Sequence, residues 1–518
     1  MQEMTVHAPE RRSWPAWRAR ALAGLAGIAQ TLAFAPRDAW WLQLLAAAAL
    51  FALVERTASR RDALWLGGGF GVASFVSGIW WLYISMHTYG GMPGAMAGAA
   101  VVLFSVYLAI YPALAAFFTR WVGATGPWRA LAFAGAWTLA EWLRGTVFTG
   151  FPWLSPGYAH VDGPLAGFAP LVGVYGIGGL AALAAAWLAR GVLPAHAGAR
   201  PARRLAAVLG VLILLGAGAG LARHAWTSPS GTPLTVRLLQ GNVAQDMKFE
   251  RAGIEHAMAM YRDMIVAAPA DLIITPETAF PVLLQGIPPE VAGPVREFAD
   301  RTGSHVVLGA VGATLTERGP TDLTNSLFGV TPRDQTLYRY DKHHLVPFGE
   351  FIPWGFRWFV EMMHIPLGDF RRGTATPSGF PVRGQRVALD ICYEDLFGEE
   401  IARSLREVAE PATVLANATN LAWFGDTIAL DQHLQIARMR TLETGRPMLR
   451  ATNTGASAII DAHGRVQGRL PTMTTGALTG SVQPYSGLTP YVRFGNGPAL
   501  GLAIVALGLG LAMTRRKR

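Results

Sequence analysis

The chain contains a single cysteine, Cys392, at a place where a thiol can act as a nucleophile. It ends the apolar run 387–391 and is followed at once by Tyr393, Glu394 and Asp395. Such a run predicts a strand, and a thiol on the turn after a strand, beside carboxylates, has the position of a catalytic nucleophile. A lone cysteine is also commonly a small buried hydrophobe. Both interpretations stay open.

Two more reactive side chains, Glu277 and Lys342, have the same kind of position. Glu277 follows the apolar run 271–275, and Lys342 follows a predicted strand at 336–340. Active sites of open α/β sheets form where strands end, so together with Cys392 these residues make a candidate site. Only a thiolate attacks well, and Glu277 is suited to remove the thiol proton if it is buried. Attack on a carbonyl creates an oxyanion, which Lys342 and a backbone N–H after the cysteine are suited to stabilise.

The elements that must position these residues lie in the more polar part of the chain, residues 227–493. Strands alternate with amphipathic helices in its first part, and strand-rich stretches follow. This order favours an α/β layered sandwich. We expect strands at 235–239, 271–275, 305–309, 325–330, 336–340, 386–391, 412–418, 448–451, 457–461 and 477–482, and helices at 253–267, 289–302, 396–408 and 430–443.

The remainder of the chain is too apolar for a soluble protein. Of all 518 residues, 51% are hydrophobic and only 15% are charged. We expect an N-terminal bundle of about seven spans over 1–226, the soluble domain over 227–493, and one closing span with a basic tail over 494–518. The first two spans are short for a membrane core of about 30 Å, and they form either a hairpin or a helix with a re-entrant break. The eight spans are expected near residues 20–36, 39–54, 63–86, 94–119, 128–145, 164–189, 204–222 and 497–514.

Basic residues fall mainly in the loops on one side of this expected bundle. The opposite loops, 87–93 and 146–163, contain no Lys or Arg, and Arg37 is the one exception to the pattern. Basic loops mark the cytoplasmic side, so we expect both termini in the cytoplasm and the soluble domain outside the cytoplasmic membrane. The net charge of +10 then reflects topology and contact with anionic membrane lipid. We expect no nucleic-acid partner.

The expected topology affects the choice between the catalytic and the structural interpretation of Cys392. An extracytoplasmic domain lies in an oxidising compartment, where paired cysteines form disulfides. A single cysteine forms no intramolecular disulfide and risks oxidation there, whereas Ala, Val or Ser would fill a structural position without that risk. The catalytic interpretation of Cys392 therefore gains weight, and the structural one stays open.

Longer strings around these residues resemble known motifs. "ITPETAFP", "YDKHHLVPFGEFIP" and "LDICYEDLF" resemble the Glu, Lys and Cys motifs of the nitrilase superfamily, in the family's order. "LLQGNV", "ATNLAWFGDT" and "HLQIARMRTLETGRPMLRATNTG" extend the resemblance. With eight spans and "FTGFPWL" between the fifth and sixth, the chain is similar over nearly its whole length to the family of apolipoprotein N-acyltransferases of Gram-negative bacteria.

This resemblance implies an α-β-β-α sandwich and a two-step acyl transfer without a cofactor or a metal. Cys392 would take the acyl group of a phospholipid, in particular phosphatidylethanolamine, as a thioester. The amine of a diacylated apolipoprotein would then attack that thioester. Glu277 would be the base in both steps, and Lys342 would hold the oxyanion. The resemblance also implies a bacterial inner-membrane protein with a periplasmic catalytic domain, and we expect a monomer.

The same motifs supply supporting residues. Glu350 corresponds to the family's second glutamate, and Tyr393 and Glu394 to the residues after the nucleophile. We expect the two glutamates to position Lys342 and the substrate amine.

Further candidates for substrate binding are aromatic, and two positions depart from the family pattern. Trp423 belongs to the "ATNLAWFGDT" string, and Trp153, with Phe151, either lines a lipid entry or belongs to an ordinary aromatic belt. Phe249 stands where the family commonly has Trp, so an indole N–H donor is lost. Leu421 stands where an acidic residue is common, and we expect no polar role for it.

Three other features have a structural alternative. His343 and His344 suggest a Cys–His dyad, but polar loop residues are the favoured interpretation. The aromatic segment 351–363 favours an arm at the membrane interface over core packing. For Glu141 and Arg144, one turn apart within an expected span, a structural ion pair is favoured over a functional one.

Two other classes of function remain. A membrane-anchored amidase of the nitrilase type would use the same three residues to hydrolyse a C–N bond. It would need only one span, so the extensive bundle favours a lipid substrate. A transporter or receptor with an extracytoplasmic sensor domain would tolerate Cys392→Ser, but it would need paired polar residues in its spans, which are scarce.

Overall fold

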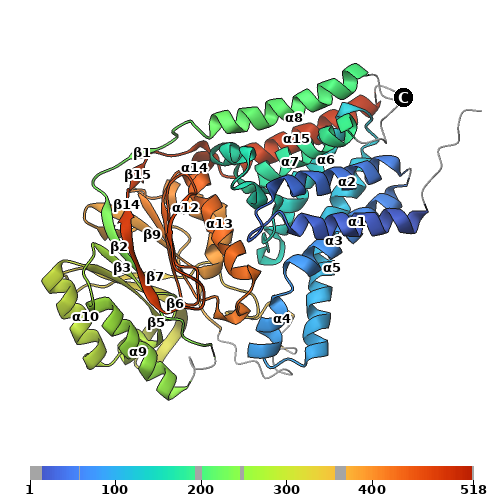
Figure 1. Cartoon of the computed structure of the whole chain (residues 1–518). Helices are drawn as coiled ribbons and strands as arrows, with labels where there is room; N and C mark the ends of the chain where they lie inside the picture. The colour runs from blue at the N-terminus through green and yellow to red at the C-terminus, as the bar shows by residue number, and fades with distance from the viewer. Residues whose placement is uncertain are drawn as a thin grey trace, which may run out of the picture.

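The computed structural model describes residues 15–57, 59–192, 201–245, 250–355, 357 and 369–515. A bundle of long helices lies beside an α/β body, and the C-terminal helix returns to the bundle (Figure 1). The bundle helices are α1 (Ala16–Thr31), α2 (Trp40–Arg56), α3 (Arg60–Gly78), α4 (Leu82–Ile84), α5 (Gly94–Trp121), α6 (Pro127–Arg144), α7 (Ala169–Val192), α8 (Pro201–Leu221) and α15 (Gly497–Arg515), with a π-helical turn η1 (Ser85–Tyr89) after α4.

Each expected span contains a helix, but not every helix is long and apolar enough to cross a membrane by itself. Among the described residues four are: α5, α8, α15 and the helical stretch Pro164–Val192. The pair Arg60–Gly78 and Leu82–Tyr89, bent by 62°, makes a fifth if it is one span. Helices α1 and α2 have only 16 and 17 residues, and α6 carries three charged residues. The structure therefore supports a membrane bundle in which four or five of the described spans are clear by length and composition.

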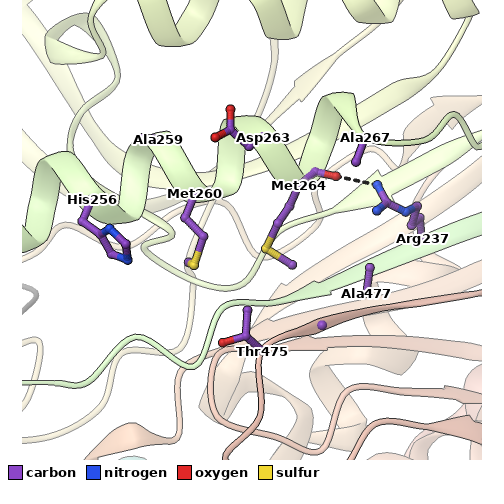
Figure 2. A pocket seen from close by; sticks show the side chains of 10 residues that line it. Arg237, His256, Ala259, Met260, Asp263, Met264, Ala267, Thr475 and Ala477 are labelled. Carbon is purple, nitrogen blue, oxygen red and sulfur yellow. Dashed lines mark hydrogen bonds between the residues drawn. The ribbon is translucent and has the colours of Figure 1, made fainter.

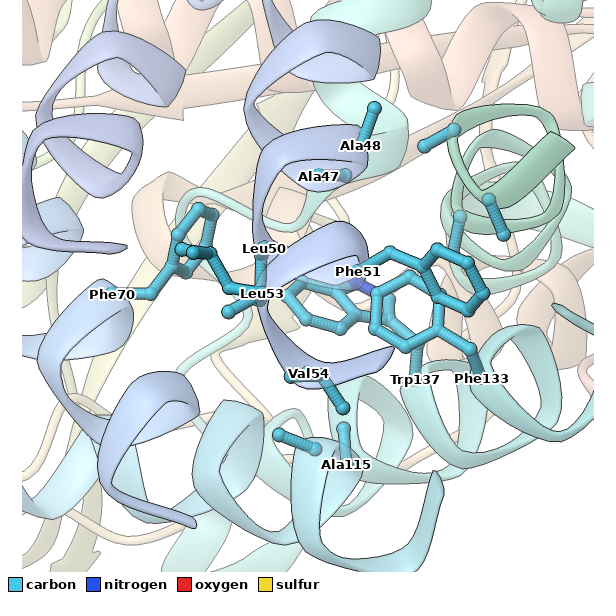
Figure 3. Close-up of a cluster of buried hydrophobic side chains, with 14 of the residues drawn as sticks. Ala47, Ala48, Leu50, Phe51, Leu53, Val54, Phe70, Ala115, Phe133 and Trp137 are labelled. Carbon is cyan, nitrogen blue, oxygen red and sulfur yellow. The ribbon is translucent and has the colours of Figure 1, made fainter. Parts of the chain in front are cut away.

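Close helix packing explains the many small residues of the bundle. A Cβ atom added to Gly27 of α1 would lie 2.2 Å from the carbonyl oxygen of Phe70 on α3. Helices α1 and α2 lie side by side (Figure 1), so the hairpin is the correct one of the two expected alternatives. Larger side chains fill the space between α2, α3 and α6 (Figure 3), among them Phe51, Phe70, Phe133 and Trp137.

The α/β body contains two large sheets. The first has the strand order β14-β2-β3-β5-β6-β7, with β4 paired to β5, and the second has the order β13-β12-β11-β10-β9-β8. The strands are β2 (Leu234–Gln240), β3 (Leu272–Ile274), β4 (Phe280–Leu283), β5 (His305–Thr316), β6 (Gly319–Val330), β7 (Tyr338–Asp341), β8 (Phe380–Val382), β9 (Gln385–Ile391), β10 (Val414–Thr419), β11 (Met448–Thr452), β12 (Ala458–Ile460), β13 (Val466–Arg469) and β14 (Gly476–Val482). A short pair, β1 (Ser228–Pro229) and β15 (Tyr485–Ser486), lies apart from both sheets.

The two sheets bury one apolar core between them and are covered by helices outside. Val236, Leu389 and Ala416 belong to that shared core. Helices α9 (Arg251–Val266) and α10 (Pro289–Thr302) pack on the first sheet. Helices α12 (Gly398–Arg406) and α13 (Ile428–Thr444) pack on the second, and a short α14 (Pro490–Phe494) leads back to the bundle. The body is thus an α-β-β-α sandwich, as expected.

Most of the expected strands and helices of this body are present, many with boundaries shifted by one or two residues. The expected strands 305–309 and 325–330 are much longer, because β5 continues to Thr316 and β6 begins at Gly319. The sequence did not predict β4, β8 and β13, which have only three or four residues each. Short strands of this kind depend on neighbouring strands for their hydrogen bonds, so their own residues give little periodic signal.

Candidate active site

The nucleophile candidate lies on a tight turn at the end of β9. Cys392 has φ +54°, in the left-handed region that residues other than glycine seldom adopt. The turn η8 (Cys392–Leu396) follows directly. On the neighbouring strand β10, the Nδ2 group of Asn417 donates to the carbonyl oxygen of Cys392 at 3.1 Å and to the carboxylate of Asp390. The neighbouring strand therefore holds the unusual backbone that presents the thiol.

Glu277, Lys342 and Cys392 come together at this edge of the sandwich. The Nζ atom of Lys342 lies 2.9 Å from Oε1 of Glu350 and 3.5 Å from Oε1 of Glu277. The Cys392 thiol interacts electrostatically with both Glu277 and Lys342. Lys342 is almost fully buried, so these charges act on one another with little screening by water.

The surroundings raise the pKa of both the thiol and the amine, which keeps the thiol neutral and the amine positively charged. Burial raises the pKa of Cys392, and the Glu277 carboxylate raises it further, while Lys342 lowers it. The thiol is therefore protonated at rest and needs a base. Burial lowers the pKa of Lys342, but Glu350 and Glu277 more than compensate, so its pKa lies above the ordinary value. Lys342 therefore stays positively charged, which suits it to stabilise an oxyanion.

Two asparagines that the sequence analysis did not single out hold the carboxylates in place. The Nδ2 group of Asn325 donates to Oε1 of Glu277 and to Oε1 of Glu350, each at 2.7 Å. The backbone N–H of Asn420 donates to Oε2 of Glu277 at 2.9 Å. Asn420 lies in the "ATNLAWFGDT" string, which was a usable signal, whereas Asn325 begins an apolar strand and gave none.

Glu394 fixes the backbone on both sides of the site. Its carboxylate accepts hydrogen bonds from Tyr340 Oη at 2.6 Å and from the backbone N–H groups of Ile391 at 2.7 Å, His343 at 2.7 Å and His344 at 3.0 Å. A carboxylate has about four acceptor positions, so none is left for a substrate amine. Glu394 therefore joins the residues that follow Lys342 to those that precede the cysteine.

Glu350 contacts Lys342 directly. Its Oε1 atom accepts from Lys342 and Asn325, and its Oε2 atom accepts from the backbone N–H of Val346 at 2.8 Å. Glu350 thus joins Lys342 to Asn325 and to the backbone at Val346.

The aromatic candidates lie where the sandwich meets the bundle. Tyr393 Oη donates to the carbonyl oxygen of Gly150, between α6 and α7, at 2.9 Å. Trp423 packs edge to face on Tyr89, with ring centroids 6.1 Å apart. Trp153 is 2% exposed, so it is a buried interface residue rather than part of a lipid-facing belt.

Of the remaining candidates, one lies outside the described residues, one is described in part and one is described fully. Phe249 lies outside the described residues, as does most of the aromatic segment 351–363, of which the structure describes 351–355 and 357. Within that described part, Trp354 is 98% exposed. Leu421 is fully buried, consistent with an apolar role.

The two histidines after Lys342 have partners other than the thiol. His343 Nδ1 lies 2.8 Å from the carbonyl oxygen of Gly373. His344 stacks on Phe397, with centroids 3.5 Å apart, and its Nδ1 lies 2.9 Å from Oε1 of Glu400. These contacts favour the expected role as polar loop residues.

Glu141 and Arg144 form a buried ion pair of 2.5 Å. Arg144 also donates to the carbonyl oxygens of Phe151 and Trp153, the latter at 2.8 Å, and to Ser155 Oγ at 3.0 Å. The pair therefore fastens the loop after α6, which is the structural role expected for it.

A groove of about 610 Å³ on the sandwich lies away from these residues. Figure 2 shows it between α9, which contributes Met260 and Met264, and the edge strand β14. None of Glu277, Lys342 and Cys392 lines it. Within the described part of the chain, no cluster of three or more His, Cys, Asp or Glu side chains is arranged to hold a metal ion.

Comparison with known proteins agrees with this division into two bodies. Residues 26–187 match the family "Apolipoprotein N-acyltransferase N-terminal domain", and residues 235–491 match the family "Carbon-nitrogen hydrolase". The chain is 58% identical to a protein of Ralstonia nicotianae named apolipoprotein N-acyltransferase, over 96% of this chain and 93% of that one. It is 45% identical to a Bordetella bronchiseptica protein of the same name, over 97% and 98%. A solved CN-hydrolase superfamily protein from Xanthomonas campestris is similar at 19% identity and a TM-score of 0.37, covering 49% of this chain and 91% of that one.

Proposed function

The chain belongs to the apolipoprotein N-acyltransferase family, whose reaction is the N-acylation of lipoproteins, and on this premise we propose its donor and its chemistry. The acyl chain comes from a membrane phospholipid, in particular phosphatidylethanolamine. Cys392 carries it as a thioester, and the acceptor is the α-amine of a diacylated apolipoprotein.

In the first step Glu277 removes the proton of the Cys392 thiol, and the thiolate attacks the ester carbonyl of the phospholipid. The oxyanion that forms is stabilised by Lys342. The carbon–oxygen bond of the ester then breaks, and the leaving lysophospholipid takes the proton from Glu277. This assignment is supported by the position of Lys342, whose ammonium group bridges Glu277 and Glu350.

In the second step the amine of the lipoprotein attacks the thioester, and Glu277 takes a proton from it. Lys342 again stabilises the oxyanion. The carbon–sulfur bond breaks, an amide is formed, and the thiolate regains its proton from Glu277. The same three side chains therefore serve both steps, and no cofactor is needed to balance the reaction.

One observation above all supports a lipid donor: the nucleophile turn touches the bundle. Tyr393, next to Cys392, is bonded to the loop after α6. Leu396, at the end of the same turn, accepts a hydrogen bond of 3.2 Å from Tyr158, which lies in the same inter-helix region. A hydrolase of small amides has no need of such contact, whereas an enzyme that takes its acyl group from the bilayer does.

For the membrane topology we propose eight spans, with both termini in the cytoplasm and the sandwich in the periplasm of the inner membrane. The domains are 1–226, 227–493 and 494–518, in a monomer. The charges of α6 lie near its two ends: Arg129 donates to the carbonyl oxygen of Ala124 at 2.7 Å, and Arg144 pairs with Glu141. Charges that are near helix ends and bonded within the protein support a span.

Intact-mass measurement of the full-length protein in detergent tests the proposal. Incubation with phosphatidylethanolamine is expected to add one acyl chain that hydroxylamine removes, and a diacylated lipopeptide is expected to take that chain on its amine. Cys392→Ala should gain no mass. Release of the adduct as free fatty acid regardless of lipopeptide would indicate a lipid hydrolase. A folded protein without an adduct would contradict a phospholipid donor and favour the small-amide hydrolase.

A further inference from the structure

Helix α13 lies between the second sheet and the bundle (Figure 1), and nearly all of its side chains are buried. Three of them are polar groups that bond to interruptions in the bundle helices. Gln432 contacts the bend after α3, Gln435 contacts the turn between α1 and α2, and Glu443 contacts the break inside α7. Interrupted helices leave backbone groups without helical partners, and α13 supplies hydrogen bonds at all three interruptions. At the first of them it shares the carbonyl oxygen of Gly78 with the indole N–H of Trp81, which donates at 3.1 Å.

Gln432 makes the most contacts of the three. Its Oε1 atom accepts from the indole N–H groups of Trp81 at 3.2 Å and of Trp153 at 2.8 Å. Its Nε2 group donates to the carbonyl oxygen of Gly78, the last residue of α3, at 3.3 Å. One amide thereby joins the α3–α4 bend to the loop that follows α6.

The rings held by Gln432 belong to a continuous aromatic series. Trp153 stacks near Phe151, with centroids 6.3 Å apart, and Phe151 packs on Phe104 of α5 at 5.0 Å. Beside Phe104, the side chain of Leu103 is 69% exposed on an apolar helix long enough to span the membrane. The series therefore runs from the lipid-facing surface of α5 to the sandwich.

The next residue along α13, His433, connects to the nucleophile turn. His433 Nε2 lies 3.0 Å from Oδ1 of Asp395, and Arg450 donates to Oδ2 of Asp395 at 2.9 Å. Asp395 is three residues after Cys392, on the same turn. Neighbouring residues of α13 therefore bond on one side to a bend in the bundle and on the other to the turn that carries the thiol.

We propose that Gln432 is a positioning residue for the acyl donor. By holding the α3–α4 bend and the loop of Trp153 against α13, it sets where a membrane-bound acyl ester meets Cys392. This inference rests on the phospholipid donor proposed above. It predicts that Gln432 governs delivery of the lipid ester and leaves the reactivity of the thiol itself unchanged.

Gln432→Met tests this, because it keeps the length and packing of the side chain but removes its hydrogen bonds. The matched control is Gln435→Met on the same helix: Gln435 is also buried, accepts from the N–H of Ala35 at 3.3 Å, and donates to Asp38 at 2.9 Å. The full chain is placed in lipid nanodiscs of phosphatidylethanolamine. Acylation of Cys392 is followed by intact mass, and alkylation of the same thiol by iodoacetamide is followed in parallel.

Gln432→Met is expected to slow acylation by phosphatidylethanolamine roughly ten- to a hundredfold, as small misplacements of a reacting group do, with alkylation unchanged and a much smaller effect in Gln435→Met. Full acylation by the Gln432→Met protein overturns the inference. So does an equal loss in both variants, which would indicate general docking of the two bodies, or an equal loss of alkylation, which would indicate a damaged thiol. A wild-type protein that is alkylated but never acylated overturns the phospholipid donor itself.

Discussion

Two clusters of buried charge lie on either side of the nucleophile turn, and they differ in how fully the charges are matched. Asp395 pairs one to one with Arg450 at 2.9 Å and lies 3.0 Å from His433. On the other side, Lys342 faces two carboxylates, Glu277 and Glu350. A matched cluster holds a fold in place, whereas an unmatched carboxylate beside a thiol is able to take a proton. Burial alone does not distinguish the two.

The largest expected effect comes from removing the thiol. Cys392→Ala should reduce lipoprotein acylation by about four to six orders of magnitude, as loss of a covalent nucleophile does, because no thioester is formed. Transfer to a fluorescent diacylated lipopeptide measures this. Thermal unfolding of the variant should match that of the wild type, and retained transfer would remove Cys392 from the mechanism.

The next largest effect concerns Glu277, which is expected both to act as the base and to raise the pKa of the thiol. Glu277→Gln should slow transfer by about two to four orders of magnitude, the usual contribution of a general base. The Glu277 carboxylate raises the pKa of Cys392, so its neutral replacement should lower the thiol pKa. Alkylation by iodoacetamide against pH should therefore move to lower pH in Glu277→Gln, while transfer is lost.

Lys342→Met should shift the same alkylation profile in the opposite direction. Lys342 lowers the pKa of the thiol, so its removal should move the alkylation profile to higher pH. If both variants moved the profile the same way, the opposed electrostatic roles of Glu277 and Lys342 would be wrong.

The matched cluster should affect stability rather than chemistry. Asp395→Asn leaves the buried Arg450 without its charged partner, which should cost about 3–5 kcal/mol of folding free energy. Unfolding monitored by tryptophan fluorescence in detergent measures the loss. Transfer per folded molecule should change far less than in Glu277→Gln. A catalytic defect without destabilisation would move Asp395 into the reaction.

The smallest effect is expected at the rim between the two bodies. Asp162, in the loop before α7, pairs with Arg438 of α13, and its side chain is 46% exposed. Asp162→Ala should cost about 0.2–1 kcal/mol, as exposed ion pairs do, with a lower cost at high salt. The same unfolding measurement, repeated at two ionic strengths, checks both statements.

The positions of Glu277, Lys342 and Cys392 were predictable because each follows a strand, and strand ends share one edge of a sheet. Their partners were predictable only in part: Glu350 and the string that contains Asn420 stood out in the sequence, whereas Asn325 did not. Asn325 bonds to Glu277 across 48 positions of sequence, and an asparagine inside an apolar strand gives no local pattern. Strand signals therefore predict the candidate reacting groups before they predict all the groups that orient them.

The helices of the membrane part were predictable from the sequence, but their breaks and their crossings of the membrane were not. Each apolar stretch was predictable as a helix, but hydropathy did not determine which helices cross the membrane individually. The bend after Gly78 and the break at Gly173 each receive a hydrogen bond from α13, far along the chain. The region 430–443 was predictable as a helix, but its burial on both sides was not, because its polar side chains find partners only in the assembled protein.

The break in α7 has a consequence for biosynthesis. Gly173 has φ +62°, and the N–H of Val174 is capped by Glu443, which follows it by 269 residues. At translation rates of about 5–20 residues per second, the ribosome needs roughly 13–54 s to make that interval. During this time the bundle lacks the cap that the finished protein provides, so the final form of the bundle is reached only after the α/β body has been made and folded.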